Sequence, residues 1–194
     1  MARPARPLLA LLAAATVALA GPALAEDPPP AKPFAKRLGQ VTGIPYVAEV
    51  APGLYRGAQP SKEGVAWLKE QGIRTVINLR HYHGNRTGEG RWVEEQGMRY
   101  EHLPLASSDA PSTTSITRFL ALLADPKLRP IYVHCQHGVD RTGTMMAVYR
   151  MEVEHWTNQE ALAEMLEFGA HAIWRDLLGF VARYQPTWRA KRDR

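Results

Sequence analysis

Hydrophobic and polar positions change their period several times along the chain, and three short runs have the composition of buried strands. Residues 73–79 are β-branched and apolar, which predicts a central strand. A second strand is predicted over residues 100–105 and a third over residues 131–133. The third strand would deliver His134 and Cys135 to its carboxyl end, where open α/β sheets bind their ligands.

Segments with the periodicity of α-helices separate these three predicted strands. Ser61 can cap a helix that continues to Gln71, with Gly72 as its stop. The other predicted helices are a short one that ends near Gly97, one that begins near Ser112 or Thr113, one from Arg141 onward, and two structural ones over residues 158–168 and 171–184. Alternating strands and helices predict an α/β fold in which helices flank both faces of a central, mostly parallel sheet.

The amino-terminal 25 residues have a different pattern. Arg3 and Arg6 form a basic start, residues 8–20 are almost entirely apolar, and small residues precede a cleavage site at Ala25. A membrane-spanning helix needs about 20 apolar residues, and this run is shorter. We expect residues 1–25 to be a signal peptide that is removed near Ala25. The protein would then be periplasmic or secreted, without a stable membrane anchor.

Length and composition predict one globular domain. The chain has 194 residues, of which 45% are hydrophobic and 22% are charged, enough for one core but not for a second catalytic domain. Residues 26–50 are rich in proline and predict an extended linker that leads into a domain over residues 51–188. Residues 189–194 form a basic tail, typical of a solvated terminus.

The charge and the cysteine count narrow the function. The net charge is +5, and removal of Arg3 and Arg6 leaves 22 basic against 19 acidic residues, or +3, which is too mild to indicate nucleic-acid binding. A mildly basic protein still favours anionic substrates. The chain has one cysteine and thus no intramolecular disulfide, and a lone thiol in an oxidising compartment calls for a chemical reason.

The loop between the third strand and the following helix supplies that reason. Its sequence, HCQHGVDRTG, places Cys135 and Arg141 at either end of a tight turn that opens a helix. Backbone N–H groups of such a turn and the positive end of the helix dipole form an anion site suited to phosphate. The same field stabilises a thiolate, so Cys135 is predicted to be a nucleophile, although an inert buried thiol is the alternative.

The other residues of this loop have supporting roles in the prediction. Arg141 can hold two phosphoryl oxygens with its planar guanidinium, or it can be an ordinary salt-bridged helix residue. The Thr142 hydroxyl can donate to the thiolate when it is the leaving group, and His134 orients the loop. The residues predicted to bind phosphate are Gln136, His137, Gly138, Val139, Asp140 and Arg141.

This loop resembles the H-C-x5-R-[ST] signature of the cysteine-dependent tyrosine and dual-specificity phosphatases. A looser resemblance extends over residues 54–149, where LYRGAQPS, VINLR and LPLASSDAPS are similar to segments of the small bacterial dual-specificity-like members. The resemblance implies hydrolysis of phosphate monoesters in two steps, through a cysteinyl-phosphate intermediate and with neither a metal nor another cofactor.

That mechanism requires a general acid for the leaving oxygen, and two residues are candidates. Asp109 follows the strand predicted over residues 100–105, where the resembling family carries its mobile acid; otherwise it is an ordinary loop residue. Asp140 is the rival, because the loop also resembles that of myotubularin-type lipid phosphatases, which carry aspartate just before the arginine. Its structural alternative is a salt bridge to a nearby base or a hydrogen bond that braces the loop.

The substrate and two other functions stay open at this stage. Phosphoproteins, inositol phosphates and phosphoinositides all fit, although the charge of Asp140 opposes a polyanion, which a protonated His137 would partly offset. Arg56 and Arg80 either add positive charge at the rim or brace loops. A phosphate-binding module without turnover and a sulfur-transfer enzyme are the alternative functions.

Two further features complete the sequence prediction. His81 and His83 form a pair without a third ligand at a defined spacing, which indicates ordinary loop histidines and not a metal site. Nothing in the pattern indicates the oligomeric state.

Overall fold

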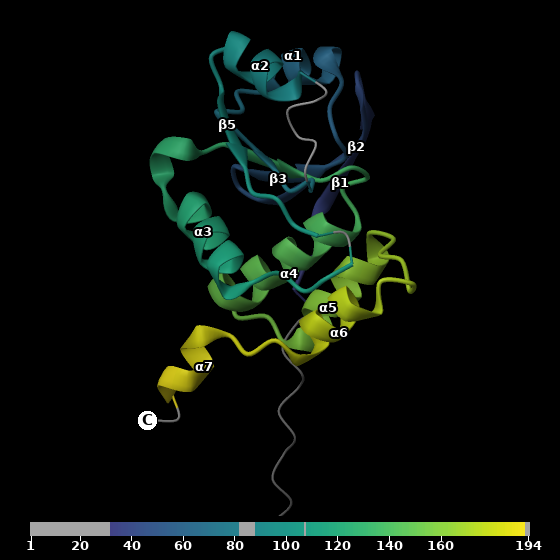
Figure 1. The fold of residues 1–194 in the computed structure, drawn as a ribbon, viewed down its shortest axis with the longest axis vertical. Coiled ribbons are helices and arrows are strands. Elements are labelled where there is room, and N and C mark those ends of the chain that lie inside the picture. The colour runs from purple at the N-terminus through teal and green to yellow at the C-terminus, as the bar shows by residue number, and fades with distance from the viewer. Residues whose placement is uncertain (1–31, 82–87, 107, 193–194) are drawn as a thin grey trace, which may run out of the picture. The chain divides into compact units, whose positions relative to one another are not determined.

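A computed structural model describes residues 32–81, 88–106 and 108–192 of the chain (Figure 1). Within these ranges the chain forms a six-stranded sheet in the order β1-β2-β3-β6-β4-β5. The strands are β1 (Lys36–Val41), β2 (Ile44–Ala51), β3 (Leu54–Gly57), β4 (Thr75–Asn78), β5 (Arg99–His102) and β6 (Ile131–His134). Strand β6, which carries the predicted catalytic loop, lies between β3 and β4 and is buried along its whole length.

The prediction of a mostly parallel sheet is confirmed. Strand β6 pairs in parallel with both β3 and β4, and β4 pairs in parallel with β5. The hairpin of β1 and β2 adds two antiparallel pairings at the β3 edge. The parallel strands therefore point their carboxyl ends toward the same edge, and the loop after β6 begins there.

Helices flank both faces of the sheet, as predicted (Figure 1). Helices α1 (Lys62–Glu70) and α2 (Glu89–Glu95) pack on one face, where Val65 and Val93 join the strand residue Val76. Helices α3 (Thr113–Ala124) and α4 (Asp140–Val153) pack on the other, where Phe119 and Met145 join Ile77.

The carboxyl-terminal helices form an outer layer against α4. Helices α5 (Asn158–Glu167) and α6 (Arg175–Arg183) pack there through a cluster that includes Met151, Met165 and Val181. A short 3-10 turn, η1 (Pro126–Leu128), precedes β6, and α7 (Thr187–Arg192) follows α6. Helix α4 is therefore covered on both sides, which explains why nearly all of its residues are buried and its pattern is not amphipathic.

Local capping explains where several helices begin. The Gly64 N–H donates to Ser61 Oγ at 3.3 Å, and the Ser115 N–H donates to Ser112 Oγ at 3.1 Å, so both predicted starts are confirmed. The last predicted helix is shorter than expected: it begins at Arg175, and residues 169–174 form the connection to it. That connection lies at the candidate site described below.

The prediction of a linker over residues 26–50 is wrong from Lys36 onward, because β1 and β2 belong to the sheet. The chain turns between them at Gly43, and Ile44, Val47 and Ala48 are buried. Proline content favoured the linker interpretation, but the β1–β2 register slips where Pro45 lies, so its missing N–H breaks no ladder bond. The domain therefore begins before residue 51.

The predicted signal peptide and the first residues of the predicted linker lie outside the described residues. In the part of the chain that the structure does describe, no helix is long and apolar enough to cross a membrane. In the predicted basic tail, Arg189 Nη1 donates to Asn158 Oδ1 at 3.0 Å, so the beginning of this tail is attached to α5.

Candidate active site

The loop between β6 and α4 forms a cavity of about 420 Å³. Cys135 is at its base and only 3% exposed, whereas Gln136 and His137 are exposed and Arg141 is partly exposed. The residues that line the cavity are Cys135, Gln136, His137, Asp140, Arg141, His171, Ile173 and Trp174. The predicted nucleophile and the predicted phosphate-binding arginine therefore share one site at the amino end of α4.

Close backbone packing fixes the turn of this loop. Gly138 has a φ of +71°, in the left-handed region, and a Cβ on it would lie 2.0 Å from the Gly57 carbonyl oxygen at the end of β3. The Gln59 N–H also donates to the Gln136 carbonyl at 3.1 Å. Glycine is required at position 138, because it adopts this φ readily and has no Cβ to clash with Gly57. The loop is therefore held against β3.

Two side chains from β2 and β3 hold the same part of the loop. Arg56 is fully buried, and its Nη2 donates to the Gly138 carbonyl at 2.9 Å, with Phe168 stacked 4.4 Å from the guanidinium. The Tyr46 hydroxyl donates to the same carbonyl. Of the two roles open for Arg56, the structure selects the brace.

Burial favours the protonated form of the Tyr46 and Tyr132 hydroxyls near the loop. Burial raises the pKa of Tyr46, the Arg56 charge lowers it, and the negative charge of Cys135 raises it again, with a net upward shift. Tyr132 is fully buried, and burial raises its pKa well above the usual value. Both hydroxyls are therefore protonated donors near neutral pH, Tyr46 to the loop and Tyr132 to the Ala58 carbonyl at 2.6 Å.

His134 connects the nucleophile to a buried carboxylate. Its Nδ1 lies 2.8 Å from the Cys135 carbonyl, and its Nε2 lies 2.9 Å from Glu89 Oε1, with both side chains fully buried. The Nε2 contact is close but is not aligned as a hydrogen bond. Glu89 also accepts from Gln59 Nε2 at 2.8 Å and Asn78 Nδ2 at 3.3 Å. These contacts fix the His134 ring under the loop, the position needed for the orienting role that the sequence predicts.

Thr142 and Val139 lie at the start of α4. The Thr142 hydroxyl is fully buried, and within the described residues it has no hydrogen-bond partner. Such a donor is available to a ligand or to the thiolate, because buried hydroxyls are otherwise nearly always paired. Val139 is the residue before the first turn of α4, so its position in the loop matches the predicted phosphate-binding segment.

Asp140 is bound to a histidine from the α5–α6 connection. Its Oδ1 accepts the His171 backbone N–H at 2.9 Å, and the His171 Nδ1 lies 2.9 Å from Oδ2 and 3.1 Å from Oδ1. The Asp140 side chain is 11% exposed and that of His171 is 55% exposed. The contact with a nearby base that the sequence offered as the structural alternative for Asp140 is therefore present, and it lies at the wall of the Cys135 cavity.

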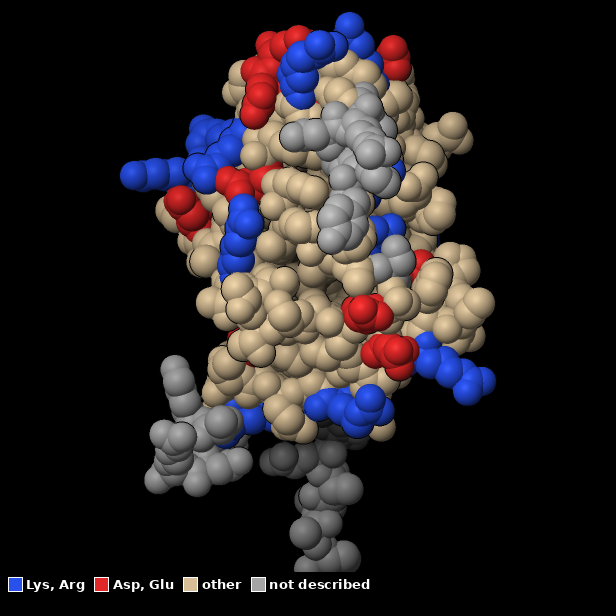
Figure 2. Space-filling view, viewed as in Figure 1, with Lys and Arg blue, Asp and Glu red and all other residues tan. Residues whose placement is uncertain are grey.

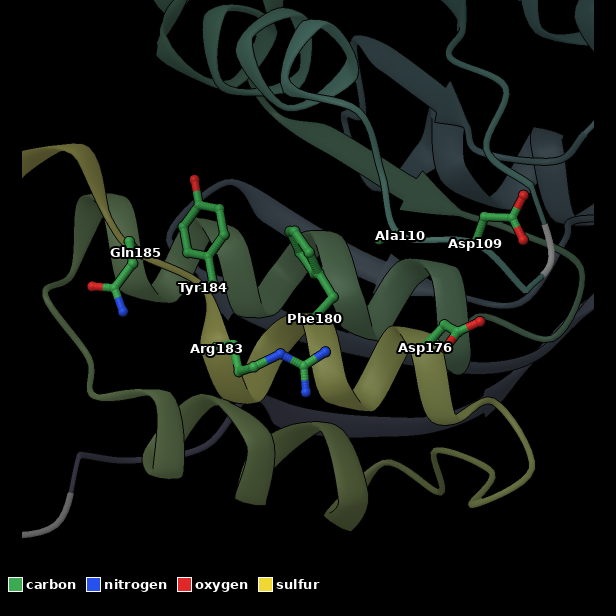
Figure 3. A pocket seen from close by; sticks show the side chains of 7 residues that line it. All are labelled: Asp109, Ala110, Asp176, Phe180, Arg183, Tyr184 and Gln185. Atoms are coloured by element: carbon green, nitrogen blue, oxygen red, sulfur yellow. The ribbon is translucent and has the colours of Figure 1, made fainter.

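Asp109 lies in a different pocket. Figure 3 shows it with Asp176 at one end of a pocket of about 530 Å³ between the loop before α3 and helix α6, with Phe180 in the middle and Gln185 at the other end. Asp109 is exposed, and its Oδ1 accepts from Ser108 Oγ at 2.8 Å. It is not among the residues that line the Cys135 cavity, so the structure does not bring this candidate acid to the nucleophile.

Comparison with known proteins identifies the family. The model of the family described as "DSP-PTPase phosphatase fused to NAD+ Kinase" matches residues 46–174, more than half of the chain. The chain belongs to this family. The matched range includes every residue of the loop and every residue that lines the Cys135 cavity.

Individual members of the phosphatase family agree with this assignment. Dual specificity protein phosphatase TpbA of Pseudomonas aeruginosa is 30% identical over 134 residues, which cover 68% of this chain and 59% of TpbA, less than two thirds of that relative. The crystal structure of P. aeruginosa TpbA superimposes with a TM-score of 0.66 at 28% identity and covers 81% of this chain and 92% of the other. A structure of a Cys-to-Ser variant of TpbA in complex with pTyr gives a TM-score of 0.65 at 27% identity, with the same coverage.

Sequence reasoning missed three residues that contact the loop or its neighbours. Tyr46 lies in the segment predicted to be a linker, Glu89 follows a polar loop where a carboxylate is usually solvated, and His171 was placed at the start of a structural helix. Each reaches the loop from a distant part of the chain, so local periodicity contains no signal for it. The burial of Glu89 at 0% is the observation that reveals its role.

Charge and metal ligands add little to the family assignment. On the face drawn in Figure 2, Lys and Arg side chains of the described residues are interspersed with Asp and Glu side chains and do not merge into a basic surface. No group of three or more His, Cys, Asp or Glu residues with metal-binding geometry occurs among the residues described. His83 lies outside these residues, so the histidine pair is not described as a whole.

Proposed function

We propose that this protein hydrolyses phosphate monoesters through a cysteinyl-phosphate intermediate on Cys135. The observation that supports this most is the single cavity at the amino end of α4 that contains both Cys135 and Arg141. The braced loop would present its N–H groups to a phosphate without reorganisation. Preorganised donors of this kind stabilise developing charge better than water does.

The first chemical step forms the intermediate. The Cys135 thiolate attacks phosphorus, the bond from phosphorus to the ester oxygen breaks, and that oxygen takes a proton from a general acid as it leaves. Arg141 binds two of the equatorial oxygens and offsets the charge that spreads over them. In the second step water attacks phosphorus, the S–P bond breaks, and the electron pair returns to sulfur, where the buried Thr142 hydroxyl stabilises it.

We propose Asp109 as the acid for the first step, although it lines a different pocket from Cys135, because the Asp140 carboxylate is bound by His171. Asp109→Asn is expected to lower the rate with an alkyl phosphate by about 10²–10⁴-fold, and to have a much smaller effect with p-nitrophenyl phosphate, whose leaving group needs no proton. The measurement is kcat/KM for both esters. Asp176→Asn, at the same pocket, is the matched control, and an equal loss with both esters would argue against an acid role.

The substrate we propose is phosphotyrosine in proteins. Ile173 is 77% exposed at the rim of the cavity beside Trp174, which offers an apolar surface to an aryl ring next to the phosphate site. The acidic Asp140 in the loop disfavours polyanions such as inositol phosphates. TpbA, whose variant binds pTyr, is consistent with this choice. A panel of phosphotyrosine peptide, phosphoserine peptide and inositol hexakisphosphate would rank the classes by kcat/KM.

The direct test is phosphate release by the reduced protein in the presence of a chelator, together with acid quenching during turnover. We expect turnover of p-nitrophenyl phosphate without added metal, and a phosphoryl adduct on the peptide that contains Cys135. Absence of turnover with every ester would overturn the proposal and favour a phosphate-binding module. Turnover of thiosulfate, in place of esters, would favour sulfur transfer.

We also propose that the protein acts outside the cytoplasm, as a periplasmic or secreted enzyme. The signal-peptide pattern of residues 1–25 supports this. Expression of the full chain in a bacterium, followed by fractionation and amino-terminal sequencing, should give a product in the periplasm or medium that begins near Glu26. An uncleaved cytoplasmic product would contradict it.

A further inference from the structure

The pair of Asp140 and His171 has the arrangement of a proton-transfer dyad beside the nucleophile. The Asp140 side chain is largely buried, its two oxygens face the His171 ring, and the His171 backbone N–H fixes the same carboxylate. His171 is more than half exposed and lines the cavity that holds Cys135. One nitrogen of the ring is thus held by the protein, and the ring itself borders the space where a phosphate would be bound.

The hydrogen bonds determine which nitrogen carries the proton. An ionised carboxylate can only accept hydrogen bonds, so the Nδ1 that contacts Asp140 must be the N–H donor. In the neutral ring Nε2 is then the acceptor, with its lone pair free of the carboxylate. A buried aspartate that fixes a histidine tautomer in this way makes the other nitrogen a base.

We infer that His171 is the general base that activates water in the second step, with Asp140 as its positioning residue. This inference rests on the proposed cysteinyl-phosphate mechanism. A water proton passes to His171 Nε2 as the water oxygen forms its bond to phosphorus. The S–P bond breaks, its electron pair returns to Cys135, and inorganic phosphate leaves, after which His171 releases the proton to solvent.

The protonation of the dyad assigns it to the second step and not to the first. In the first step of the proposed mechanism the thiolate attacks directly, so this step needs no base, while the leaving oxygen needs an acid. A neutral histidine whose only ring proton points to Asp140 cannot donate at the cavity. The second step has the opposite requirement, because water must lose a proton as it attacks.

The same geometry gives Asp140 a role different from that of the acid. Its carboxylate is directed at His171, and an amide in its place would alter the tautomer. In Asp140→Asn, the amide nitrogen can donate to Nδ1 and so favour the proton on Nε2, which turns the base into a donor. Asp140→Asn is therefore expected to impair the same step as His171→Ala, although it retains an acceptor for the His171 N–H.

The test measures the decay of phosphocysteine directly. The enzyme is loaded with p-nitrophenyl phosphate, the substrate is diluted out, and the phosphoryl adduct on Cys135 is followed by rapid acid quench and mass spectrometry. We expect His171→Ala to slow the decay by about 10²-fold or more, while the release of nitrophenol in the first turnover stays close to that of the wild type. Asp140→Asn should slow the same decay.

Imidazole rescue separates catalysis from a structural effect. Added imidazole can occupy the space of the missing ring in His171→Ala and should restore the decay of the adduct, whereas a collapsed α5–α6 connection would not respond. His155→Asn is the control, because His155 is exposed, lies outside the cavity, and has a φ of +55° that asparagine tolerates.

Each result of this experiment is decisive. Slow decay with rescue supports the assignment. Unchanged decay overturns it, as does slow decay without rescue. Loss of the first-turnover burst in His171→Ala with normal decay would place the residue in the first step and also overturn it. Failure of the proposed function is distinguishable, because the wild-type protein itself would then form no adduct.

Discussion

Replacing Cys135 by serine is expected to lower phosphate release from p-nitrophenyl phosphate by on the order of 10⁴-fold or more. The hydroxyl occupies nearly the same volume, so the buried site keeps its packing, but a serine hydroxyl at the amino end of α4 is not ionised and is a much weaker nucleophile than a thiolate. Steady-state kinetics of the purified variant, beside the wild type, measures the loss.

The affinity for a phosphotyrosine peptide and the thermal stability of the fold should change little in Cys135→Ser. Arg141 and the N–H groups of the loop remain, so Cys135→Ser is expected to bind a phosphotyrosine peptide with an affinity near that of the wild type in calorimetry. The thermal midpoint should also change little. Activity within tenfold of the wild type would exclude Cys135 as the nucleophile, and loss of both folding and activity would leave Arg141→Lys as the variant that tests the site.

The largest expected effect on stability comes from Glu164→Ala. The Arg150 side chain donates to Glu164 through Nη2 at 2.7 Å and Nε at 3.1 Å, and both residues are buried. Burial lowers the pKa of Arg150, but the hydrogen bonds and charge of Glu164 outweigh this and raise it. Removing one member of a buried ion pair costs about 3–5 kcal/mol. We expect a loss near the lower end of this range, because Arg150 Nη1 keeps its bond to the partly exposed Glu154 at 2.6 Å.

Urea unfolding with linear extrapolation measures this loss, and two further variants show its origin. The double variant Arg150→Met with Glu164→Leu should recover most of the stability, because it removes both charges and keeps the volume. Glu167→Ala, on the same helix but exposed, should change the free energy of unfolding little. Equal effects of Glu167→Ala and Glu164→Ala would show that loss of the buried ion pair is not the cause.

The strand, loop and helix around Cys135 could be predicted from the sequence because their signals are local. A buried apolar run, a glycine in the turn and the spacing of cysteine and arginine all lie within residues 131–143. Strands β4, β5 and β6 and the helices that flank the sheet followed from the same periodicity. The position of Cys135 and Arg141 at the start of a helix could therefore be predicted before any tertiary contact was known.

The side-chain contacts that hold this loop could not be predicted from the sequence, because they join distant segments of the chain. Tyr46 and Gly138 are 92 positions apart, and Asp140 and His171 are 31 apart. Glu89 illustrates the same limit: a carboxylate in a polar stretch predicts solvent exposure, and only the fold places it against His134 in the interior. The hairpin of β1 and β2 was missed because its prolines favour a linker, although Pro45 lies where the ladder is already irregular.

A cut within the β1–β2 hairpin would divide the sheet that carries the site. Strand β2 pairs with the outer edge of β3, and its Tyr46 hydroxyl donates to the Gly138 carbonyl. Just before β1, the Ala35 N–H donates to Glu164 at 2.7 Å. A proteolytic fragment that began at residue 51 would expose that edge and free one brace of the loop. The domain that carries the site therefore includes Ala35 and both strands of the hairpin.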